Sequence, residues 1–251
     1  MRRLLWIIIP ALLLLAAFQL SRVSASWRFI VPDAPGTLLY ASGFDATTAA
    51  DDWEQAFGLV SAALTADALQ LAVNTAPNST VFAPLRWYWR DFDFTVDAVA
   101  LSGPENNGFG VLFHQTDLEN YAYFLISSDG YYSLSRVLAG QPQDLSVWIP
   151  SPLIETGMGA RNRLRVVAQG GVYRFYVNGQ PLAMCIPDNP DAQSTYNDLT
   201  GECLQGQMLT DITVGVPNYG RVGVVALSVA DPDVLVAFDN AVLYSPSEPP
   251  A

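Results

Sequence analysis

The sequence has few of the residues that usually carry catalysis or metal binding: no lysine, one histidine, two cysteines and six glutamates among 251 residues. Two thiols cannot form a zinc site alone, and His114 is the single imidazole that could join them. There is no serine-nucleophile motif and no phosphate-binding loop. Gly108 and Gly110 form a GxG pattern, but it lies inside a strand pattern and does not open a helix.

Positive charge is also scarce. The formal net charge is −12. Without Arg2, Arg3 and Arg22, the 24 acidic residues face nine arginines, a net charge of −15. Such a surface repels phosphate backbones and anionic lipid, which argues against nucleic acid as a partner. It remains compatible with a neutral glycan, a bound cation or a cell-surface or extracellular protein.

The N-terminal 25 residues have the organisation of a secretory signal peptide. Two arginines follow Met1, an apolar run extends from Leu4 to Leu20, and Val23-Ser24-Ala25 is acceptable to signal peptidase before Ser26. The alternative is an uncleaved anchor, because the apolar run approaches the short limit for a spanning helix. Either outcome places the domain outside the cytoplasm, with membrane contact only through this segment if it is retained.

Cys185 and Cys203 are the two cysteines. In an exported chain, an even pair most simply indicates one disulfide, worth about 3 kcal/mol on a chain-entropy model. Free structural thiols are the alternative.

The remainder of the chain is typical of an all-β protein. Short β-type runs are separated by Gly, Asn, Asp or Ser, and no helical pattern divides the three runs between residues 108 and 138, so these form an antiparallel meander. One helical turn is expected within residues 46–55. No repeat of fixed period occurs, which argues against a propeller or a β-helix. Strands are predicted at residues 37–42, 59–63, 68–74, 91–101, 108–114, 120–127, 130–138, 145–149, 161–169, 172–178, 180–184, 221–229 and 234–244.

Closely spaced antiparallel strands must each bury one face, so they stack as two sheets. The predicted fold is an antiparallel two-sheet jelly-roll sandwich. The predicted organisation is a signal peptide or anchor over residues 1–25, a linker over 26–36, one sandwich over 37–245 and a disordered tail over 246–251.

Several phrases, taken in order, resemble the concanavalin A-like lectin/glucanase superfamily, closest to its laminin-G-like and 3-keto-disaccharide hydrolase-like extracellular domains. The phrases are FD at 44–45, DFDF at 91–94, NNGFGVLF at 106–113, ENYAYFLISSDGYYSL at 119–134, NRLRVVAQGG at 162–171, VYRFYVNGQPL at 172–182, GRVGVVA at 220–226 and VAFDNAVLY at 236–244. The resemblance covers roughly residues 37–245. It implies the concanavalin A-like fold, which serves lectins, glycosidases, adhesion modules and spacers.

The catalytic motif of the glycosidases that this resemblance implies is missing. Those enzymes carry two Glu and an Asp at alternating positions of one strand, with carboxyl groups about 5 Å apart. No two of the six glutamates share a predicted strand. Asp91, Asp93 and Asp97 alternate on one face, which we interpret as a solvated face. We therefore expect no enzyme activity.

Tyrosines are the best candidates for a ligand surface. Tyr121, Tyr123 and Tyr132 are predicted to line one sheet face, with Arg136 close by and a second group of arginines, Arg161, Arg163 and Arg165, near them. Flat rings stack on the C–H faces of sugars, and guanidinium groups donate hydrogen bonds to hydroxyls. The alternative is that the tyrosines pack the sandwich core.

Three further side chains are candidates for the same surface. Trp87 and Trp89 lie in an aromatic run that ends just before a long strand, and their alternative role is core packing. His114 ends the GVLF strand. It is a candidate for a ligand or structural hydrogen bond, and less so for a general base.

The superfamily resemblance also implies a structural calcium ion near the chain termini. Asp45 and Asp239, each next to a phenylalanine, are the predicted ligands, because calcium prefers carboxylate and carbonyl oxygens.

Taken together, the sequence predicts a secreted or membrane-tethered, non-catalytic, carbohydrate-binding β-sandwich. The alternative is an extracellular structural or protein-interaction domain without a sugar site. A saccharide-acting hydrolase or lyase is a third hypothesis.

Overall fold

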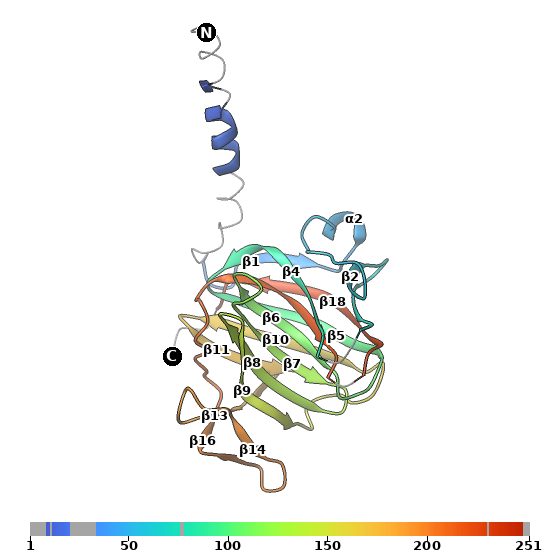
Figure 1. Ribbon diagram of the computed structural model, residues 1–251, viewed down its shortest axis with the longest axis vertical. Coiled ribbons are helices and arrows are strands. Elements are labelled where there is room, and N and C mark those ends of the chain that lie inside the picture. Colours follow the sequence, from blue (N-terminus) through green and yellow to red (C-terminus); the bar gives the residue numbers. More distant parts are fainter. Residues whose placement is uncertain (1–8, 11, 21–33, 76–77, 230, 248–251) are drawn as a thin grey trace.

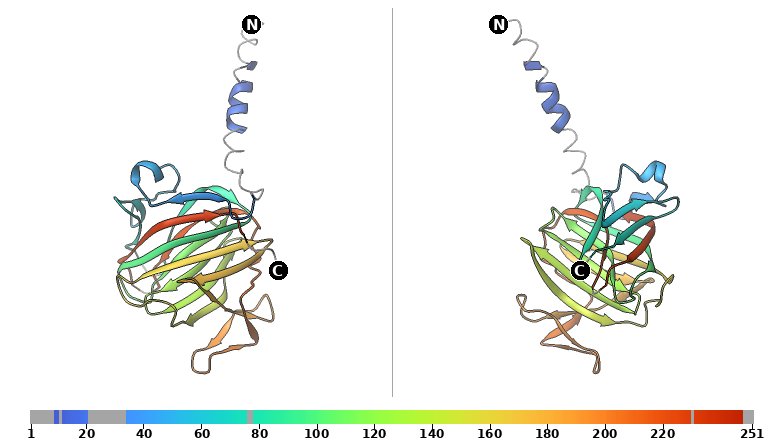
Figure 2. Two further views of the ribbon diagram at one scale, coloured as in Figure 1. Left: turned by 180° about the vertical axis from the view of Figure 1, so that it is seen from behind. Right: turned by 45° about the vertical axis from the view of Figure 1, so that its right-hand side comes forward.

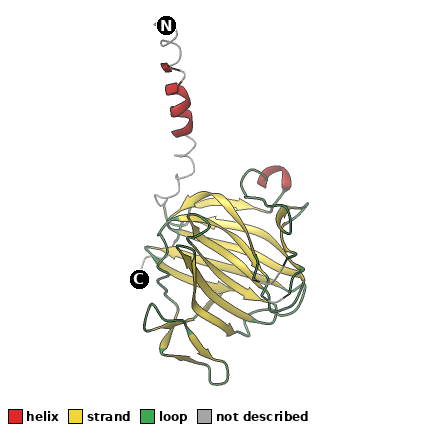
Figure 3. Cartoon of the chain, viewed as in Figure 1, coloured by secondary structure: helices red, strands yellow, loops and turns green. Residues whose placement is uncertain are grey.

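The computed structural model describes residues 9–10, 12–20, 34–75, 78–229 and 231–247. Two antiparallel sheets lie face to face (Figures 1 and 3). Among the described residues of the sandwich, one short helix, α2 (Ala46–Ala49), precedes most of the strands, and Asp45 caps it by accepting a hydrogen bond from the Thr47 backbone N–H. This helix falls inside the stretch where one helical turn is predicted.

One layer is an eight-stranded sheet whose strands come from both ends of the domain. The central β18 pairs on one side with β5 and on the other with β1 and β3 in succession. Its order is β12 (Gln180–Leu182), β11 (Val172–Val177), β10 (Arg161–Gln169), β5 (Phe92–Ser102), β18 (Val234–Tyr244), β3 (Leu69–Val73) and β2 (Val60–Leu64), with β1 (Leu38–Ser42) beside β18.

The other layer is a six-stranded sheet. It contains the three strands of the predicted meander as consecutive neighbours, β6 to β8, followed by β9, and is completed by two strands from distant parts of the chain. Its order is β4 (Thr80–Trp89), β17 (Gly220–Leu227), β6 (Gly108–Gln115), β7 (Tyr121–Ser127), β8 (Tyr131–Leu138) and β9 (Gln141–Pro150).

The core lies between the two sheets and follows from period-two alternation. Phe92 and Phe94 of β5 are fully buried on its inner face, as is Phe124 of β7. The rings of Phe124 and Phe175 stand 5.2 Å apart across the gap between the layers. Burying each such ring stabilises the fold by about 1.5–3 kcal/mol. The jelly-roll prediction is confirmed.

A small lobe extends from the edge of the sandwich next to β9, at the end away from α2 (Figures 1 and 2). It contains two short antiparallel strand pairs, β13 (Met184–Pro187) with β16 (Gly206–Leu209) and β14 (Thr195–Asn197) with β15 (Glu202–Leu204). The disulfide Cys185–Cys203 joins them, as predicted. The lobe contacts β9 through the Cys185 backbone N–H, which donates to Ser146 Oγ at 3.0 Å.

The main error in strand assignment concerns β4. The sequence predicts no strand between residues 74 and 91, whereas Thr80–Trp89 is one ten-residue strand. Pro84 lies within it and obscures the pattern. This is tolerated because β4 is an edge strand of its sheet.

The N-terminal predictions are described only in part. Residues 9–10 and 12–20 are helical, and no helix within the described part of the chain is long and apolar enough to cross a membrane. The predicted cleavage site before Ser26, most of the predicted linker and residues 248–251 of the predicted tail lie outside the described residues.

His114 is buried in the structure and is not a surface group. Near the end of β6 the register with β17 shifts, and His114 adopts a φ of 50° that turns its ring inward. It is 1% exposed. Its Nε2 donates to the Arg90 carbonyl at 3.0 Å, and its Nδ1 accepts from the Tyr173 hydroxyl at 2.9 Å. Gly220 permits this close approach, since a Cβ there would lie 2.3 Å from the His114 carbonyl carbon.

We predict that the cysteine pair stabilises the lobe. In the double variant Cys185→Ala/Cys203→Ala, the free energy of unfolding should fall by about 3 kcal/mol, because closing an 18-residue separation restricts the unfolded chain. Urea unfolding measures this loss, and amide exchange should increase first in the lobe. Leu204→Ala, 44% exposed in the same lobe, is the control and should change little. A double variant within about 0.5 kcal/mol of the wild type would contradict this role.

We predict a pH-dependent stability caused by His114. Burial lowers its pKa to about 4 from 6.5. Between these values the unfolded chain binds a proton that the folded protein excludes, so stability is lost as the pH falls from 6.5 towards 4, at up to about 1.4 kcal/mol per pH unit. Chemical unfolding at pH 7, 6 and 5 measures this slope, and the NMR titration of the single imidazole measures the pKa directly.

His114→Gln should flatten the slope above pH 5, where carboxylates contribute little. An unchanged slope in that variant, or an imidazole that titrates near 6.5, would show that the buried ring is not its source.

Candidate functional site

The outer face of the six-stranded sheet is apolar and aromatic. Leu112, Leu125 and Val225 are at most 1% exposed there, although they point away from the core. Partly buried aromatic rings of the same sheet pack over these three residues and shield them from solvent. We call Phe82, Tyr121, Tyr123 and Trp148 the aromatic face.

Alternation explains how the sequence forms this face. Tyr121, Tyr123 and Leu125 are outward on β7, while Ala122, Phe124 and Ile126 are inward and fully buried. Gly108 provides room beside them: a Cβ at this glycine would lie 3.2 Å from Trp148 Cη2 and 2.9 Å from Leu125 Cδ1. The tryptophan ring thus lies against the sheet at this position.

Each end of the aromatic face opens into a pocket. The first, of about 220 Å³, combines the Trp148 and Tyr131 rings with polar groups, and its Ser127 hydroxyl donates to Asp129. It is lined by Asn106, Ser127, Asp129, Tyr131, Trp148 and Val229. The second, of about 330 Å³, lies beside Phe82, whose ring is 5.0 Å from that of Tyr121, and includes Leu118, Gln115 and Arg221.

Polar groups also border the middle of the face. On β8 the Ser135 hydroxyl donates to Asp144 Oδ1 of β9 at 2.7 Å. Tyr123 lies directly across from Ser135 in the strand register. Burial raises the pKa of Tyr123 to about 12, so its hydroxyl remains a neutral donor and acceptor at physiological pH. The face therefore offers flat apolar rings next to hydrogen-bonding groups.

The structure places two of the three predicted tyrosines on this face and one elsewhere. Tyr132 pairs with Ile126, so it points inward; it is 4% exposed, and its hydroxyl donates to the Ala183 carbonyl at 2.7 Å. Arg136 pairs with Ala122 and is likewise directed away from the aromatic face. The expectation that both help line one open surface is wrong, because the hairpin register assigns them to the inner side.

Arg136 has a structural contact set instead. Its Nη1 donates to the Val214 carbonyl at 2.6 Å, and its Nε and Nη2 donate to Gln143 Oε1 at 3.0 and 2.7 Å. Gln143 Nε2 in turn donates to the Pro190 carbonyl of the lobe at 3.1 Å. Arg136 thus ties β8, β9 and the lobe together.

The two tryptophans of β4 are not a surface pair. Trp89 is fully buried in the core. Trp87 is partly buried, with its ring 5.6 Å from that of Tyr40, and the Arg86 guanidinium lies 4.4 Å from the ring centroid. The prediction of exposed aromatics at this position is wrong for Trp89, because the run belongs to a strand that packs on the core.

The predicted calcium ligands make other contacts. Asp45 caps α2, and hydrogen bonds from Thr47 lower its pKa. Asp239 accepts from the Asn240 backbone N–H at 2.7 Å and lies 3.6 Å from Arg161. Among the described residues, no group of three or more His, Cys, Asp or Glu side chains could hold a metal ion. Calcium binding at Asp45 and Asp239 stays a prediction.

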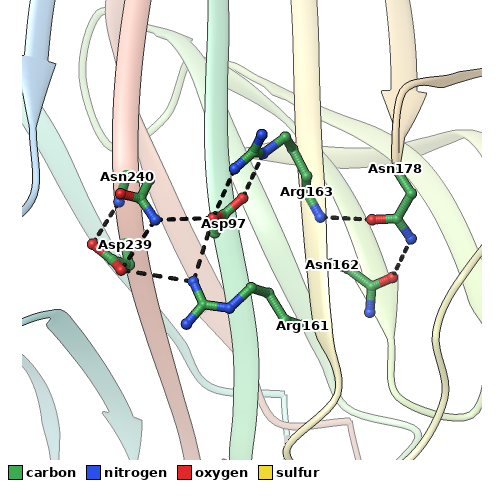
Figure 4. Close-up of polar contacts among 7 residues, drawn as sticks. All are labelled: Asp97, Arg161, Asn162, Arg163, Asn178, Asp239 and Asn240. Atoms are coloured by element: carbon green, nitrogen blue, oxygen red, sulfur yellow. Dashed lines mark hydrogen bonds and ion pairs between the residues drawn. The ribbon is translucent and has the colours of Figure 1, made fainter.

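The arginines expected near the tyrosines lie on the opposite side of the molecule. Arg161 and Arg163 of β10 point outward from the eight-stranded sheet and pair with Asp97 of β5 (Figure 4). Arg165 pairs with Asp93 at 2.7 Å. Asp93 and Asp97 are 8% and 3% exposed, so the interpretation of a solvated carboxylate face is wrong: arginine side chains cover both.

Sequence reasoning missed half of the aromatic face. Trp148 was assigned to a strand of only five residues and Phe82 to none, so neither was placed on a sheet face. Tyr131 falls in the predicted strand at residues 130–138 and Asp129 in no predicted strand, and neither is among the predicted site residues. Trp148 of β9 packs against Gly108 of β6, and these two strands are not neighbours in the sheet. No local sequence pattern predicts this contact.

No family model matches the chain, and no curated protein sequence matches it. Solved structures do. The carbohydrate-binding module CBM66 from Bacillus subtilis superposes with a TM-score of 0.54 at 13% identity, covering 77% of this chain and 96% of that one. A protein of unknown function with a galectin-like fold, also from Bacillus subtilis, gives a TM-score of 0.55 at 11% identity, over 84% and 97%.

A xylan β-1,4-xylosidase from Bacillus halodurans matches with a TM-score of 0.51 at 13% identity, covering 85% of this chain and 41% of the enzyme. At such identities the likeness concerns the fold, which binding modules and enzymes share. The sheet order and these superpositions together show that the chain has an antiparallel two-sheet jelly-roll sandwich fold.

Proposed function

We propose that this protein is a non-catalytic carbohydrate-binding domain that holds a neutral glycan on the aromatic face. The observation that carries the proposal is the outward, partly exposed set of Tyr121, Tyr123 and Trp148 above a sealed aliphatic layer. Partly exposed rings next to hydrogen-bonding groups suit sugars, which present C–H faces to rings and hydroxyls to polar atoms.

The residues of the first pocket and of β7 would contact different units of the glycan. Trp148 and Tyr131 form the apolar wall of the 220 Å³ pocket, and Asn106, Ser127 and Asp129 provide the polar groups. We assign to this pocket the sugar unit that contacts both rings and hydrogen-bonding groups. Tyr123 and Tyr121, whose ring centroids are 6.0 Å apart, continue the surface across β7 for further units.

Three further facts support the proposal. The carbohydrate-binding module that superposes on the chain shows that this fold is used for such binding in another protein. The net charge of −15 for the chain without its first 25 residues favours a neutral over an acidic glycan. The disulfide fits the predicted location outside the cytoplasm, where such bonds persist.

A protein-interaction role is the second candidate, and one observation favours it. Leu118 is 74% exposed at the rim of the second pocket, and Phe57 and Leu59 are 80% and 69% exposed on the chain leading into β2, whose Val60 also lines that pocket. Exposed apolar side chains of this size are common at protein interfaces. A protein ligand would contact these residues, whereas a sugar in the first pocket would not.

We predict that glycan binding depends on the aromatic face. A glycan array should identify a neutral ligand, and isothermal titration with that glycan should give a dissociation constant at least tenfold larger for Trp148→Ala and for Tyr123→Ala, since each removes a stacking ring worth about 1.4 kcal/mol or more.

Tyr176→Ala is the matched control: it removes a partly buried tyrosine from the outer face of the other sheet and should leave the affinity unchanged. Thermal unfolding verifies that each variant is folded. If no glycan binds, or if binding survives both aromatic-face variants, the proposed site is wrong. Loss of binding to an extracellular protein in Leu118→Ala would support the second candidate.

A further inference from the structure

A third pocket lies on the opposite side of the sandwich from the two pockets of the aromatic face. It has a volume of about 330 Å³ and is lined by Asp97, Arg161, Arg163 and Asn178 on the outer face of the eight-stranded sheet. Its residues come from β5, β10 and the β11–β12 turn, and β18 contributes Asp239 and Asn240 next to it (Figure 4). None of these groups contributes to the aromatic face.

Asp97 organises this cluster. Arg163 donates to it from Nε at 2.7 Å and from Nη2 at 3.1 Å, Arg161 from Nη1 at 3.3 Å, and Asn240 Nδ2 at 3.0 Å. Burial by itself would raise the pKa of Asp97, but the hydrogen bonds from Arg163 and Asn240 outweigh it and lower the pKa. A carboxylate that stays ionised holds both guanidinium groups in fixed orientations.

Backbone geometry prepares the same position. Asn240, with a φ of 53°, occupies a break in the register between β18 and β5, which brings its amide over Asp97. Asn178, with a φ of 50°, accepts from the Arg163 backbone N–H at 2.9 Å and donates to Asn162 Oδ1 at 2.9 Å. The cluster is therefore preorganised by contacts beneath and beside it.

Hydrogen-bonding capacity remains after these contacts. Within the described residues, Arg163 Nη1 and Arg161 Nη2 and Nε have no partner, and the two arginine side chains are 59% and 55% exposed. The Asp239 carboxylate, 31% exposed, provides acceptor oxygens beside Arg161. Fixed donors and an acceptor thus stand side by side at the surface.

The charge of the cluster identifies the ligand class. Arg161 and Arg163 are balanced by Asp97 and Asp239, so the site has no net charge. An anion would gain little from guanidinium groups that are already paired, and the acidic protein would repel it. A hydroxyl can accept from an arginine and donate to a carboxylate at the same time, and two adjacent hydroxyls use both kinds of group.

We propose that this cluster is a second binding site, for a neutral vicinal diol such as the hydroxyls of a sugar ring. It is independent of the aromatic face, and with both sites occupied one domain would contact two glycan segments on opposite sides. The site lacks an exposed ring, so we expect weak binding, in the millimolar range typical of small contacts.

Arginine side-chain NMR tests this proposal directly. The chain has no lysine and only twelve arginines, so the Nε–H spectrum is sparse. Glucose, mannose, galactose and fructose are titrated into the full chain, with glucuronate as the anionic comparison. At least one neutral sugar should cause saturable shifts at Arg161 and Arg163. Arg165, paired with Asp93 by two 2.7 Å hydrogen bonds, should respond little.

Variants separate this site from other causes. In Arg161→Ala, the dissociation constant obtained from the shifts at Arg163 should be at least tenfold larger. Arg161→Lys, which keeps the charge but loses the planar donors, should weaken binding in part. Arg86→Ala is the matched control, since Arg86 is 54% exposed and has the same 3.3 Å contact to one aspartate. Trp148→Ala should have no effect here, so failure of the aromatic-face proposal remains distinguishable.

Two results would overturn the inference: no saturable shift at Arg161 and Arg163 with any neutral sugar, or larger shifts with glucuronate than with every neutral sugar. The second would identify an anion site.

Discussion

Burial of one face of every strand against the opposite sheet is the constraint on which this structure depends. Once Phe92, Phe94, Phe124 and Phe175 occupy the space between the layers, alternation assigns every neighbouring residue to an outer face. The outward side chains do not have to fill the core, so their identities can be chosen to form a ligand surface. Both candidate sites consist of such residues.

The two outer faces differ in which side chains shield their buried residues from solvent. On the six-stranded sheet, aromatic rings cover Leu112, Leu125 and Val225, leaving an apolar surface with polar edges. On the eight-stranded sheet, Asp93 and Asp97 are covered by arginines from the neighbouring strand, leaving a polar surface of balanced charge. A ring-rich surface and a charge-neutral polar surface both suit neutral polyhydroxylated ligands better than anions.

Period-two alternation within one strand could be read from the sequence, and it placed Tyr121 and Tyr123 on one face correctly. Register between strands could not, because it depends on how the Ser128–Gly130 turn closes. That turn pairs Tyr123 with Ser135 and therefore sends Tyr132 and Arg136 inward. The same limit applies to Trp148 and Gly108, which meet through packing between β9 and β6. Strand β4 was not predicted because Pro84 interrupts its sequence pattern, although the edge position of β4 tolerates a proline.

Strand β9 links the aromatic face to the lobe. Its Trp148 and Asp144 belong to the aromatic face and its polar edge, while its Gln143 and Ser146 accept the hydrogen bonds that hold Arg136 and the lobe backbone. An edge strand with one free side is prone to fraying, and here the lobe contacts stabilise it from that side. Arg136 thus supports the aromatic face from the inner side: it fixes the strand that carries Trp148, although its own side chain points away from that face.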